Sequence, residues 1–393
     1  MKAFKGILIH QMMTFVFIFY ISMLYSNLYS QVIPDSPKDT INTNQGTITS
    51  NGFWIHDKVK EIQTMRIGPF IQLPKGKILT IDTLNAYTSS DGGKTWQAIP
   101  IFKDTSKFQI RPERALIKTK KGTIILAFAN DKERTKFNWN KETHDAPGAE
   151  LPTYAVRSND NGKTWSEPQK LHSEWTGAIR DIIETKDGHI VFSSMMMIHN
   201  PGHHSVLTYN SADEGKTWKR SNIIDLGGVG DHDGVTESTL EQLKGGSLKM
   251  FMRTNWGFLW ETTSTDNGVT WNNIKSTTID ASASPAMFKR LKSGRLVMIW
   301  NRNYPQGKST YPLRGGDKNF TSGLVSMQRE EISIMLSDDD GKKWSQPVVI
   351  AKTTKPRTQV AYPYFFENKP GELWISFAFS ELRISLREND FVQ

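Results

Sequence analysis

The stretch Ser-Ser-Asp-Gly-Gly-Lys-Thr-Trp at residues 89–96 recurs along the chain with the pattern S-x-D-x-G-x-[TK]-W. The further copies lie at residues 158–165, 211–218, 264–271 and 337–344. Copies spaced by roughly 50–70 residues indicate that the chain repeats one structural unit.

Each octet predicts a tight turn. The aspartate can accept hydrogen bonds from the backbone amides that follow it, and the glycine supplies a position with positive φ. The tryptophan can begin the next strand and anchor the turn on the core. An acidic motif also suggests calcium or catalysis, but the turn explains every residue of the pattern and is our interpretation.

The residues around each octet predict short strands. Alternating or apolar runs precede the octets, for example at residues 154–156, 206–208 and 331–334. Further upstream, each repeat has two apolar runs separated by a glycine-containing turn, which predicts a β-hairpin. These upstream hairpins lie at residues 70–79, 115–126, 182–192, 239–250 and 286–298.

Four strands in a repeat of about 40–70 residues are typical of the blades of a β-propeller. A sixth hairpin without an octet lies at residues 364–376, and residues 382–385 would add its third strand. Residues 46–55 would supply the fourth strand and close the ring. The sequence therefore predicts an all-β protein, with a six-bladed β-propeller at residues 46–393 and a polar linker at residues 31–45.

Residues 1–30 have the pattern of a signal peptide. Lys2 and Lys5 give a positive start, an apolar run follows at residues 12–24, and small and polar residues lead to Ser30. The apolar run is shorter than the ~20 residues of a spanning helix, which favours a cleaved signal over the alternative, a membrane anchor. We therefore expect a secreted or periplasmic protein with no stable membrane insertion after cleavage.

The composition excludes several classes of protein. The chain has no cysteine, which excludes a disulfide scaffold, a thiolate zinc site and a cysteine nucleophile. Its formal net charge is +9, yet no run of Lys and Arg marks a nucleic-acid surface, so no nucleic-acid partner is expected.

The octets resemble the Asp-boxes, or BNR repeats, of the sialidase superfamily of six-bladed β-propellers, from about residue 50 onward. In that family an arginine lies in an R-I-P segment of the first blade, and Arg66 opens a similar R-I-G-P segment. A glutamate that opens an E-x-x-x-x-x-L-x-x-G-x-L segment is followed by a second arginine, as Glu237 is followed by Arg253. A third arginine precedes a late octet and a tyrosine opens the last blade, as Arg329 and Tyr362 do here.

This resemblance implies a glycoside hydrolase similar to the exo-α-sialidases. Arg66, Arg253 and Arg329 would bind the carboxylate of the substrate, because each guanidinium presents a planar fork of donors. Tyr362 would be the nucleophile and Glu237 the base that takes its proton. A carboxylate nucleophile would be repelled by an acidic sugar, and the neutral phenol avoids this repulsion.

The acid/base of the family is an aspartate on a loop of the first blade. The corresponding loop is short here, at about residues 82–85, and its carboxylate is Asp82. Asp82 is therefore expected to protonate the leaving oxygen and later to activate water. Asp131, Asp181 and Asp233 are other acidic candidates on loops that could face the same rim.

Further residues are predicted to contact the ligand from their positions alone. Arg180 and Asp181 open the third blade at the strand position that Glu237 takes in the fourth. Asp233 lies in an Asp-His-Asp segment shortly before Glu237, and three histidines lie at positions 199, 203 and 204. Their spacing matches no metal signature, so we predict no metal and no cofactor.

Two other features are candidates for the rim of the pocket. The insertion at residues 303–328 in the fifth blade could form a lid or a wall. Trp139, Trp256 and Trp260 could stack on sugar faces, although a packing role is the more common one for such residues.

Asp-boxes alone do not define an activity, so several functions stay open. The first is an exported exo-sialidase, or a relative that releases another acidic sugar. The second is a glycosidase or lyase of the same fold acting on a different carbohydrate. The third is a non-catalytic propeller that binds glycans. All of them predict a glycan or glycoconjugate as the partner.

Overall fold

The computed structural model describes residues 45–392, which form strands and three short 3-10 segments. These segments are η1 (Pro74–Gly76), η2 (Asp131–Glu133) and η3 (Glu388–Asp390). The predicted signal peptide and nearly all of the predicted linker lie outside the described residues and stay predictions. Within the described range, no helix is long and apolar enough to cross a membrane.

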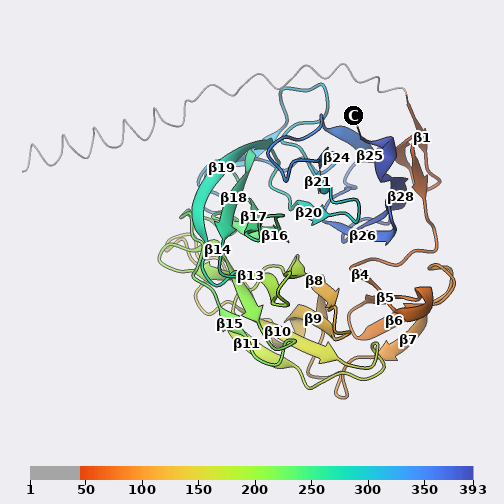
Figure 1. The fold of residues 1–393 in the computed structure, drawn as a ribbon. Coiled ribbons are helices and arrows are strands. Elements are labelled where there is room, and N and C mark those ends of the chain that lie inside the picture. Colours follow the sequence, from red (N-terminus) through yellow and green to blue (C-terminus); the bar gives the residue numbers. More distant parts are fainter. Residues whose placement is uncertain (1–44, 393) are drawn as a thin grey trace, which may run out of the picture. The chain divides into compact units, whose positions relative to one another are not determined.

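The strands form six antiparallel blades around a central axis, which confirms the predicted propeller (Figure 1). Blade 1 consists of β4 (Phe70–Gln72), β5 (Ile78–Ile81), β6 (Asn85–Ser89) and β7 (Gln97–Pro100). Blade 2 consists of β8 (Ile110–Lys118), β9 (Ile124–Asn130), β10 (Glu150–Ser158) and β11 (Gln169–Glu174). Blade 3 consists of β12 (Ile182–Glu184), β13 (Ile190–Ile198), β14 (His203–Ser211) and β15 (Lys219–Arg220).

Blades 4 to 6 have the same order, with an insertion in blade 5. Blade 4 consists of β16 (Thr236–Gln242), β17 (Leu248–Arg253), β18 (Phe258–Ser264) and β19 (Asn272–Asp280). Blade 5 contains β20 (Met287–Arg290), β21 (Leu296–Trp300), β24 (Glu331–Ser337) and β25 (Val348–Thr353). Blade 6 consists of β26 (Pro363–Lys369), β27 (Glu372–Phe377), β28 (Arg383–Arg387) and β3 (Val59–Glu61). The insertion carries a small hairpin of β22 (Leu313–Gly315) and β23 (Leu324–Ser326).

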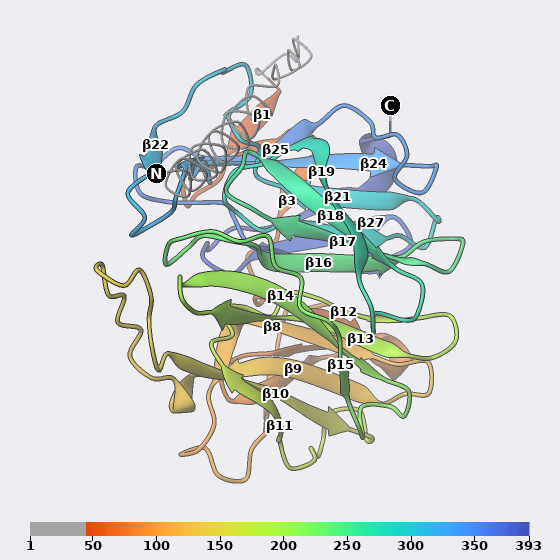
Figure 2. The ribbon, with the colours of Figure 1, turned by 90° about the vertical axis from the view of Figure 1, so that its left-hand side faces the viewer.

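The first strand of each blade lies innermost. These strands, β4, β8, β12, β16, β20 and β26, contact one another in turn, and β26 contacts β4 to complete the circle (Figure 1). Figure 2 shows from the side how the strands of successive blades lie above one another. In an antiparallel blade the first strand begins, the second ends and the third begins at one face of the ring, which we call the site face.

The ring is closed by β3, which pairs with β28 through Val59 opposite Leu386 and Glu61 opposite Ile384. The prediction that residues 46–55 supply this strand is wrong. They form β1 (Gly46–Ile48) and β2 (Phe53–His56) instead, and β2 pairs with β25 at the outer edge of blade 5.

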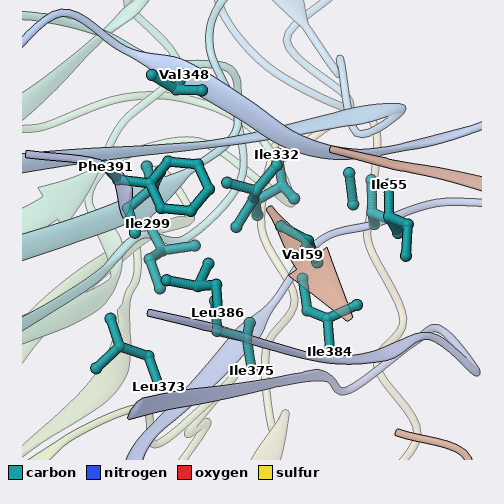
Figure 3. Packing of buried hydrophobic residues seen from close by; sticks show 14 of the residues in the cluster. Ile55, Val59, Ile299, Ile332, Val348, Leu373, Ile375, Ile384, Leu386 and Phe391 are labelled. Atoms are coloured by element: carbon teal, nitrogen blue, oxygen red, sulfur yellow. The ribbon is translucent and has the colours of Figure 1, made fainter. Parts of the chain in front are cut away.

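Packing in one hydrophobic cluster explains why β2 joins blade 5 and β3 joins blade 6. Phe53 and Ile55 of β2 and Val59 of β3 are all buried in the cluster between blades 5 and 6. Figure 3 shows Val59 beside Ile384. Since the two segments alternate apolar residues in the same way, sequence pattern alone does not tell which of them completes the last blade.

The octets form the turns between the third and fourth strands of blades 1 to 5. In the first copy, Asp91 Oδ1 accepts hydrogen bonds from the amides of Lys94 and Thr95 at 3.0 Å each. Ser89 Oγ accepts from the amide of Gly93 at 2.9 Å and donates to Asp91 at 2.8 Å. The same contacts recur in the octets that contain Asp160 and Asp213, which confirms the predicted turn.

We predict that Asp213→Ala lowers the free energy of unfolding by about 1–3 kcal/mol, because two amides and two hydroxyls lose a charged acceptor. Urea denaturation measures the loss. Lys216→Ala, in the same turn, is the control and is expected to change stability by less than about 0.5 kcal/mol. Equal effects of the two substitutions would contradict the assigned role of the aspartate.

The contribution of Asp213 is expected to depend on pH. Burial raises the pKa of Asp213, but the hydrogen bonds from Thr217, Ser211 and Lys216 outweigh burial and lower the pKa to about 2. A carboxyl whose pKa is lower in the folded state stabilises the fold above its unfolded pKa. The difference between wild type and Asp213→Ala should therefore shrink as the pH falls from about 4 towards 2.

Candidate active site

Three side chains from two different blades, blades 4 and 6, meet at the site face. Tyr362 directly precedes β26, Glu237 lies in β16 and Arg253 ends β17. The Tyr362 hydroxyl donates to Glu237 Oε1 at 2.8 Å, and Arg253 Nη1 donates to Glu237 Oε2 at 2.5 Å. Arg253 Nη1 also lies 3.2 Å from the Tyr362 hydroxyl oxygen. The predicted nucleophile and base are thus in direct contact.

The backbone is strained at both of these residues. Glu237 has φ of 33° and Tyr362 has φ of 59°, a region that non-glycine residues rarely adopt. The pairing of β16 with β17 also shifts register between Thr236 and Thr239, so that Glu237 lies in a bulge. Bulges and strained residues cluster at functional sites, where they aim a side chain away from the regular sheet.

Two more arginines flank the tyrosine. The guanidinium carbon of Arg329 lies 5.1 Å from the centre of the Tyr362 ring, and that of Arg180 lies 5.4 Å from it. Each arginine donates one hydrogen bond to a backbone carbonyl, Arg329 to Ala283 at 2.8 Å and Arg180 to Pro363 at 2.6 Å.

Other N–H groups of these arginines are buried without a hydrogen-bond partner among the described residues. They are Nε and Nη1 of Arg180, Nε of Arg253 and Nε of Arg329. Buried donors are nearly always paired in folded proteins, and an unpaired one costs free energy. Unpaired buried donors and the positive charges of three arginines around one tyrosine favour a negatively charged ligand at this site.

Burial and the neighbouring charges together set the protonation states of Tyr362 and Glu237. Burial raises the pKa of Tyr362 to about 12, with a further contribution from the charge of Glu237, so the phenol is neutral at pH 7. Burial also acts to raise the pKa of Glu237, but the positive charges of Arg253 and Arg329 outweigh it and lower this pKa. Glu237 is therefore an ionised acceptor bonded to a neutral phenol, the arrangement that a base and its nucleophile need.

Arg66 and Asp82 lie together on blade 1. Their ion pair spans 3.4 Å, and the guanidinium carbon of Arg66 lies 3.5 Å from the centre of the Tyr87 ring. Asp82 Oδ1 accepts from the amides of Leu84 and Asn85 at 2.9 Å each. Burial acts to raise the pKa of Asp82, but these amides, Tyr87 and Arg66 outweigh it and lower the pKa.

Asp181 is buried in a contact between blades. It accepts from the amide of Leu240 at 2.9 Å and the hydroxyl of Thr239 at 2.6 Å, and it forms an ion pair with Lys289. Both of its oxygens thus have protein partners.

Asp233 is likewise buried and holds the insertion of blade 5. It accepts from the amide of Val229 at 2.9 Å and from the amide and hydroxyl of Ser322. The backbone amides of Asp231 and His232 donate to Asn319 and Phe320 of the insertion. The insertion therefore forms a wall along the loop that precedes Glu237.

The remaining candidates are engaged within the protein. His203 pairs with Asp225 at 2.9 Å, and His199 pairs with Asp145 at 2.8 Å. Among residues 45–392, no cluster of three His, Asp or Glu side chains has the arrangement of a metal site. Trp256 packs on Trp260, with ring centres 5.1 Å apart, and Trp139 packs in a small cluster with Phe137 and Trp175.

A cavity of about 430 Å³ extends along the inner strands. Its lining includes Arg180 and Tyr364, which lie close to Tyr362, together with the ion pair of Asp181 and Lys289. The cavity thus lies among the inner strands of the ring, and Arg180 is the site arginine that lines it.

Glu113 and Phe379 are two residues near the site that the sequence did not indicate. Glu113 lies near the start of β8, in the second blade, and is only 4% exposed. The ring of Phe379 stands edge-on to Tyr362 with centres 4.8 Å apart, and it is exposed. Glu113 takes a position in blade 2 similar to that of Glu237 in blade 4, and this similarity was the available signal.

The fold and the repeated turns define an Asp-box β-propeller. Residues 113–375 match the profile of the BNR repeat-like domain, and residues 87–98 match that of the BNR/Asp-box repeat. The chain therefore belongs to the BNR repeat-like domain family, within the sialidase superfamily that its octets resemble.

One curated relative is a sialidase of Bacteroides fragilis, 25% identical over 280 residues. The match covers 65% of this chain and 47% of the relative, so the chain spans about half the length of that protein.

Similar solved structures share the fold at low identity. The NanB sialidase of Streptococcus pneumoniae has a TM-score of 0.55 at 15% identity, covering 84% of this chain and 69% of that chain. An α-L-arabinofuranosidase of Fusarium graminearum has a TM-score of 0.56 at 14% identity, covering 86% and 100%. A protein of unknown function from Dyadobacter fermentans has a TM-score of 0.57 at 15% identity, covering 84% and 98%.

We predict that Arg253→Met destabilises the fold by about 3–5 kcal/mol, because the Glu237 carboxylate stays buried without its ion-pair partner. Adding Glu237→Gln should recover part of this loss. Arg66→Met, which removes a partly exposed ion pair, is the matched control and should cost about 1 kcal/mol or less. Urea denaturation compares the variants.

The same substitution has an expected pH dependence. The pKa of Glu237 is lowered in the folded state, so the ion pair stabilises the fold above the unfolded glutamate pKa of about 4.3 and less below it. The penalty of Arg253→Met should therefore shrink as the pH falls below that value. A penalty that does not change with pH would contradict an ionised Glu237.

Proposed function

We propose that the chain is an exported glycoside hydrolase that releases a terminal sialic acid, or a related acidic sugar, from glycans. The observation that supports this most directly is the buried hydrogen bond between Tyr362 and Glu237, surrounded by Arg180, Arg253 and Arg329. The superfamily and the name of the Bacteroides fragilis relative are consistent with it.

The arginines would bind the carboxylate of the sugar. Their positive charges and unpaired N–H groups favour an anionic ligand, and guanidinium-to-carboxylate hydrogen bonds are among the strongest that side chains form. Sialic acids carry a carboxylate on the anomeric carbon. Binding it between the arginines would place that carbon next to the Tyr362 hydroxyl.

Tyr362 would then attack the anomeric carbon. The phenol is neutral and weakly nucleophilic at pH 7, so its proton must leave as the new bond forms. Glu237 accepts a hydrogen bond from the hydroxyl and can take this proton, while Arg253 and Arg329 stabilise the developing phenolate. A neutral nucleophile also avoids repulsion by the carboxylate of the substrate.

We expect purified protein to release the fluorophore from an aryl α-sialoside. Tyr362→Phe should lower kcat/KM by roughly 10³-fold or more, because the nucleophile is lost. Glu237→Gln should lower it by roughly 10²–10⁴-fold, because the phenol loses its base.

Tyr209→Phe is the control, because Tyr209 lies near the octet end of β14, and kcat/KM of this variant should stay at the wild-type value. Denaturation curves establish that all of the variants fold. Wild-type protein with no more activity than the Tyr362→Phe variant would overturn the assignment as a sialidase.

A second candidate is a glycosidase of this fold with a different sugar. It is favoured by the contacts of Arg66, whose guanidinium already has partners on blade 1, an ion pair with Asp82 and the ring of Tyr87. A panel of aryl glycosides that includes uronates and arabinosides distinguishes the two candidates. Binding of glycans without turnover of any of them would favour a non-catalytic propeller.

Export is part of the proposal and rests on residues 1–30. Expression of the full chain in a bacterial host should yield a mature protein outside the cytoplasm that begins close to Gln31, as mass spectrometry would detect. Val16→Asp, which interrupts the apolar run, should keep the chain in the cytoplasm. Full-length protein retained in the membrane would favour the anchor instead.

A further inference from the structure

The segment around Glu113, in the second blade, contacts the start of blade 3 and the inner strand of blade 6, next to Arg180 and Tyr362. Its backbone carbonyl accepts from the amide of Ile179, the residue before Arg180, at 3.4 Å. On the other side, the Tyr364 hydroxyl donates to the carbonyl of Pro112 at 2.5 Å and accepts from the amide of Arg114 at 3.1 Å. Tyr364 is two residues from Tyr362, so these contacts place Glu113 next to the site.

The backbone positions this glutamate as it positions Glu237. The pairing of β8 with β9 shifts register between Ile110 and Arg114, so Glu113 lies in an irregular stretch of an inner strand. Glu237 lies in a similar bulge of β16. Two inner strands thus deviate from regular pairing at the same level of the ring, and each deviation carries a glutamate.

The carboxyl group of Glu113 is buried and incompletely paired. Among the described residues, its Oε2 has no hydrogen-bond partner. The nearest cation is the Nε of Arg111 at 3.4 Å, but Arg111 donates its hydrogen bonds to the carbonyl of Gly177 and to Asp131, both at 3.2 Å. A buried carboxylate with an unpaired oxygen is costly, whereas a protonated carboxyl or one that meets a ligand is less so.

The surroundings of Glu113 and Glu237 shift the pKa values of the two carboxyls in opposite directions. Burial raises the pKa of Glu113, and the negative charge of Glu237 raises it further, against the opposing effect of Arg111. The pKa of Glu237 is lowered by its arginines. A pair of carboxyls whose pKa values are pushed apart is typical of an acid and a base in one active site.

Asp82 lacks these properties. Its Oδ1 is occupied by two amides of the turn, its Oδ2 faces Arg66, and its pKa is lowered. An ionised carboxylate that already accepts several hydrogen bonds has no proton to donate to a leaving group.

We propose that Glu113 is the general acid of the reaction, the role that the first blade was expected to supply through Asp82. This inference rests on the proposed function. In the first step Glu113 gives its proton to the glycosidic oxygen as the bond from that oxygen to the anomeric carbon breaks. The Tyr362 oxygen bonds to the anomeric carbon, and its proton passes to Glu237.

The second step reverses the roles. The Glu113 carboxylate takes a proton from a water molecule whose oxygen bonds to the anomeric carbon. The bond from that carbon to Tyr362 breaks, and the phenolate recovers its proton from Glu237. Both glutamates and the tyrosine return to their starting states, so the cycle consumes only the glycoside and water.

The test compares Glu113→Gln on two substrates of the sugar that the wild type releases, one with an aryl leaving group and one with a sugar leaving group. A sugar is a poor leaving group and needs a proton on its oxygen, whereas an activated aryl group does not. For the substrate with the sugar leaving group, kcat/KM should therefore fall by about 10²–10⁴-fold. The value for the activated aryl glycoside should fall by less than about 10-fold.

A second variant tests the base role. With Glu113→Ala, kcat for the aryl glycoside should fall because water is no longer activated, and sodium azide should restore it by forming the glycosyl azide. Azide needs no proton removal, so rescue reports the missing base rather than damaged folding. Thermal unfolding of both variants checks that the fold is kept.

Asp82→Asn is the matched comparison. We expect it to change kcat/KM for the two substrates by the same factor, without rescue by azide. The inference is overturned if Glu113→Gln lowers both substrates equally, or if Asp82→Asn shows the dependence on the leaving group. A wild type that cleaves no glycoside overturns the proposed function itself, which is a different result.

Discussion

The pairing of β3 with β28 is the contact on which the rest of the molecule depends. It joins a strand near the start of the described chain to the last blade and lets β26 lie against β4. This closure packs the last blade against the first, and the sheet edges that remain in a propeller are short and protected. Tyr362 on blade 6 reaches Glu237 on blade 4 because the inner strands are held in this circle.

The site combines several features that are unfavourable on their own. Three arginines lie close to one aromatic ring, a glutamate and a tyrosine have positive φ, and several N–H groups have no partner among the described residues. The burial of hydrophobic residues between the blades stabilises the fold that holds these groups in place. An anionic ligand would pair the open donors, so the same features that cost stability favour binding.

Much of the fold follows from the sequence because its determinants are local. An octet specifies its own turn through contacts between residues at most four positions apart, and each hairpin shows its period in a short window. Resemblance to a family indicated Glu237, Arg253, Arg329 and Tyr362, which the structure brings together. Strand position alone indicated Arg180.

The rest depended on contacts between distant segments. Asp181 and Asp233 have the residue type and position of ligand contacts, yet their oxygens are used by Thr239 and Ser322, far along the chain. Glu113 stands in an Arg-Pro-Glu-Arg segment that looks like an ordinary charged stretch. Its position in the repeat, similar to that of Glu237, was the one signal, because its burial near Arg180 depends on contacts between distant segments.

The Asp-box turns and the arginines lie at opposite ends of the strands. In blade 5, Arg329 stands just before β24 at the site face, whereas the octet begins at Ser337, where β24 ends. The repeated turns are therefore separated from the arginines by the length of a strand. A substitution in an Asp-box turn therefore removes no contact of the arginines, and a substitution among the arginines removes no hydrogen bond of a turn.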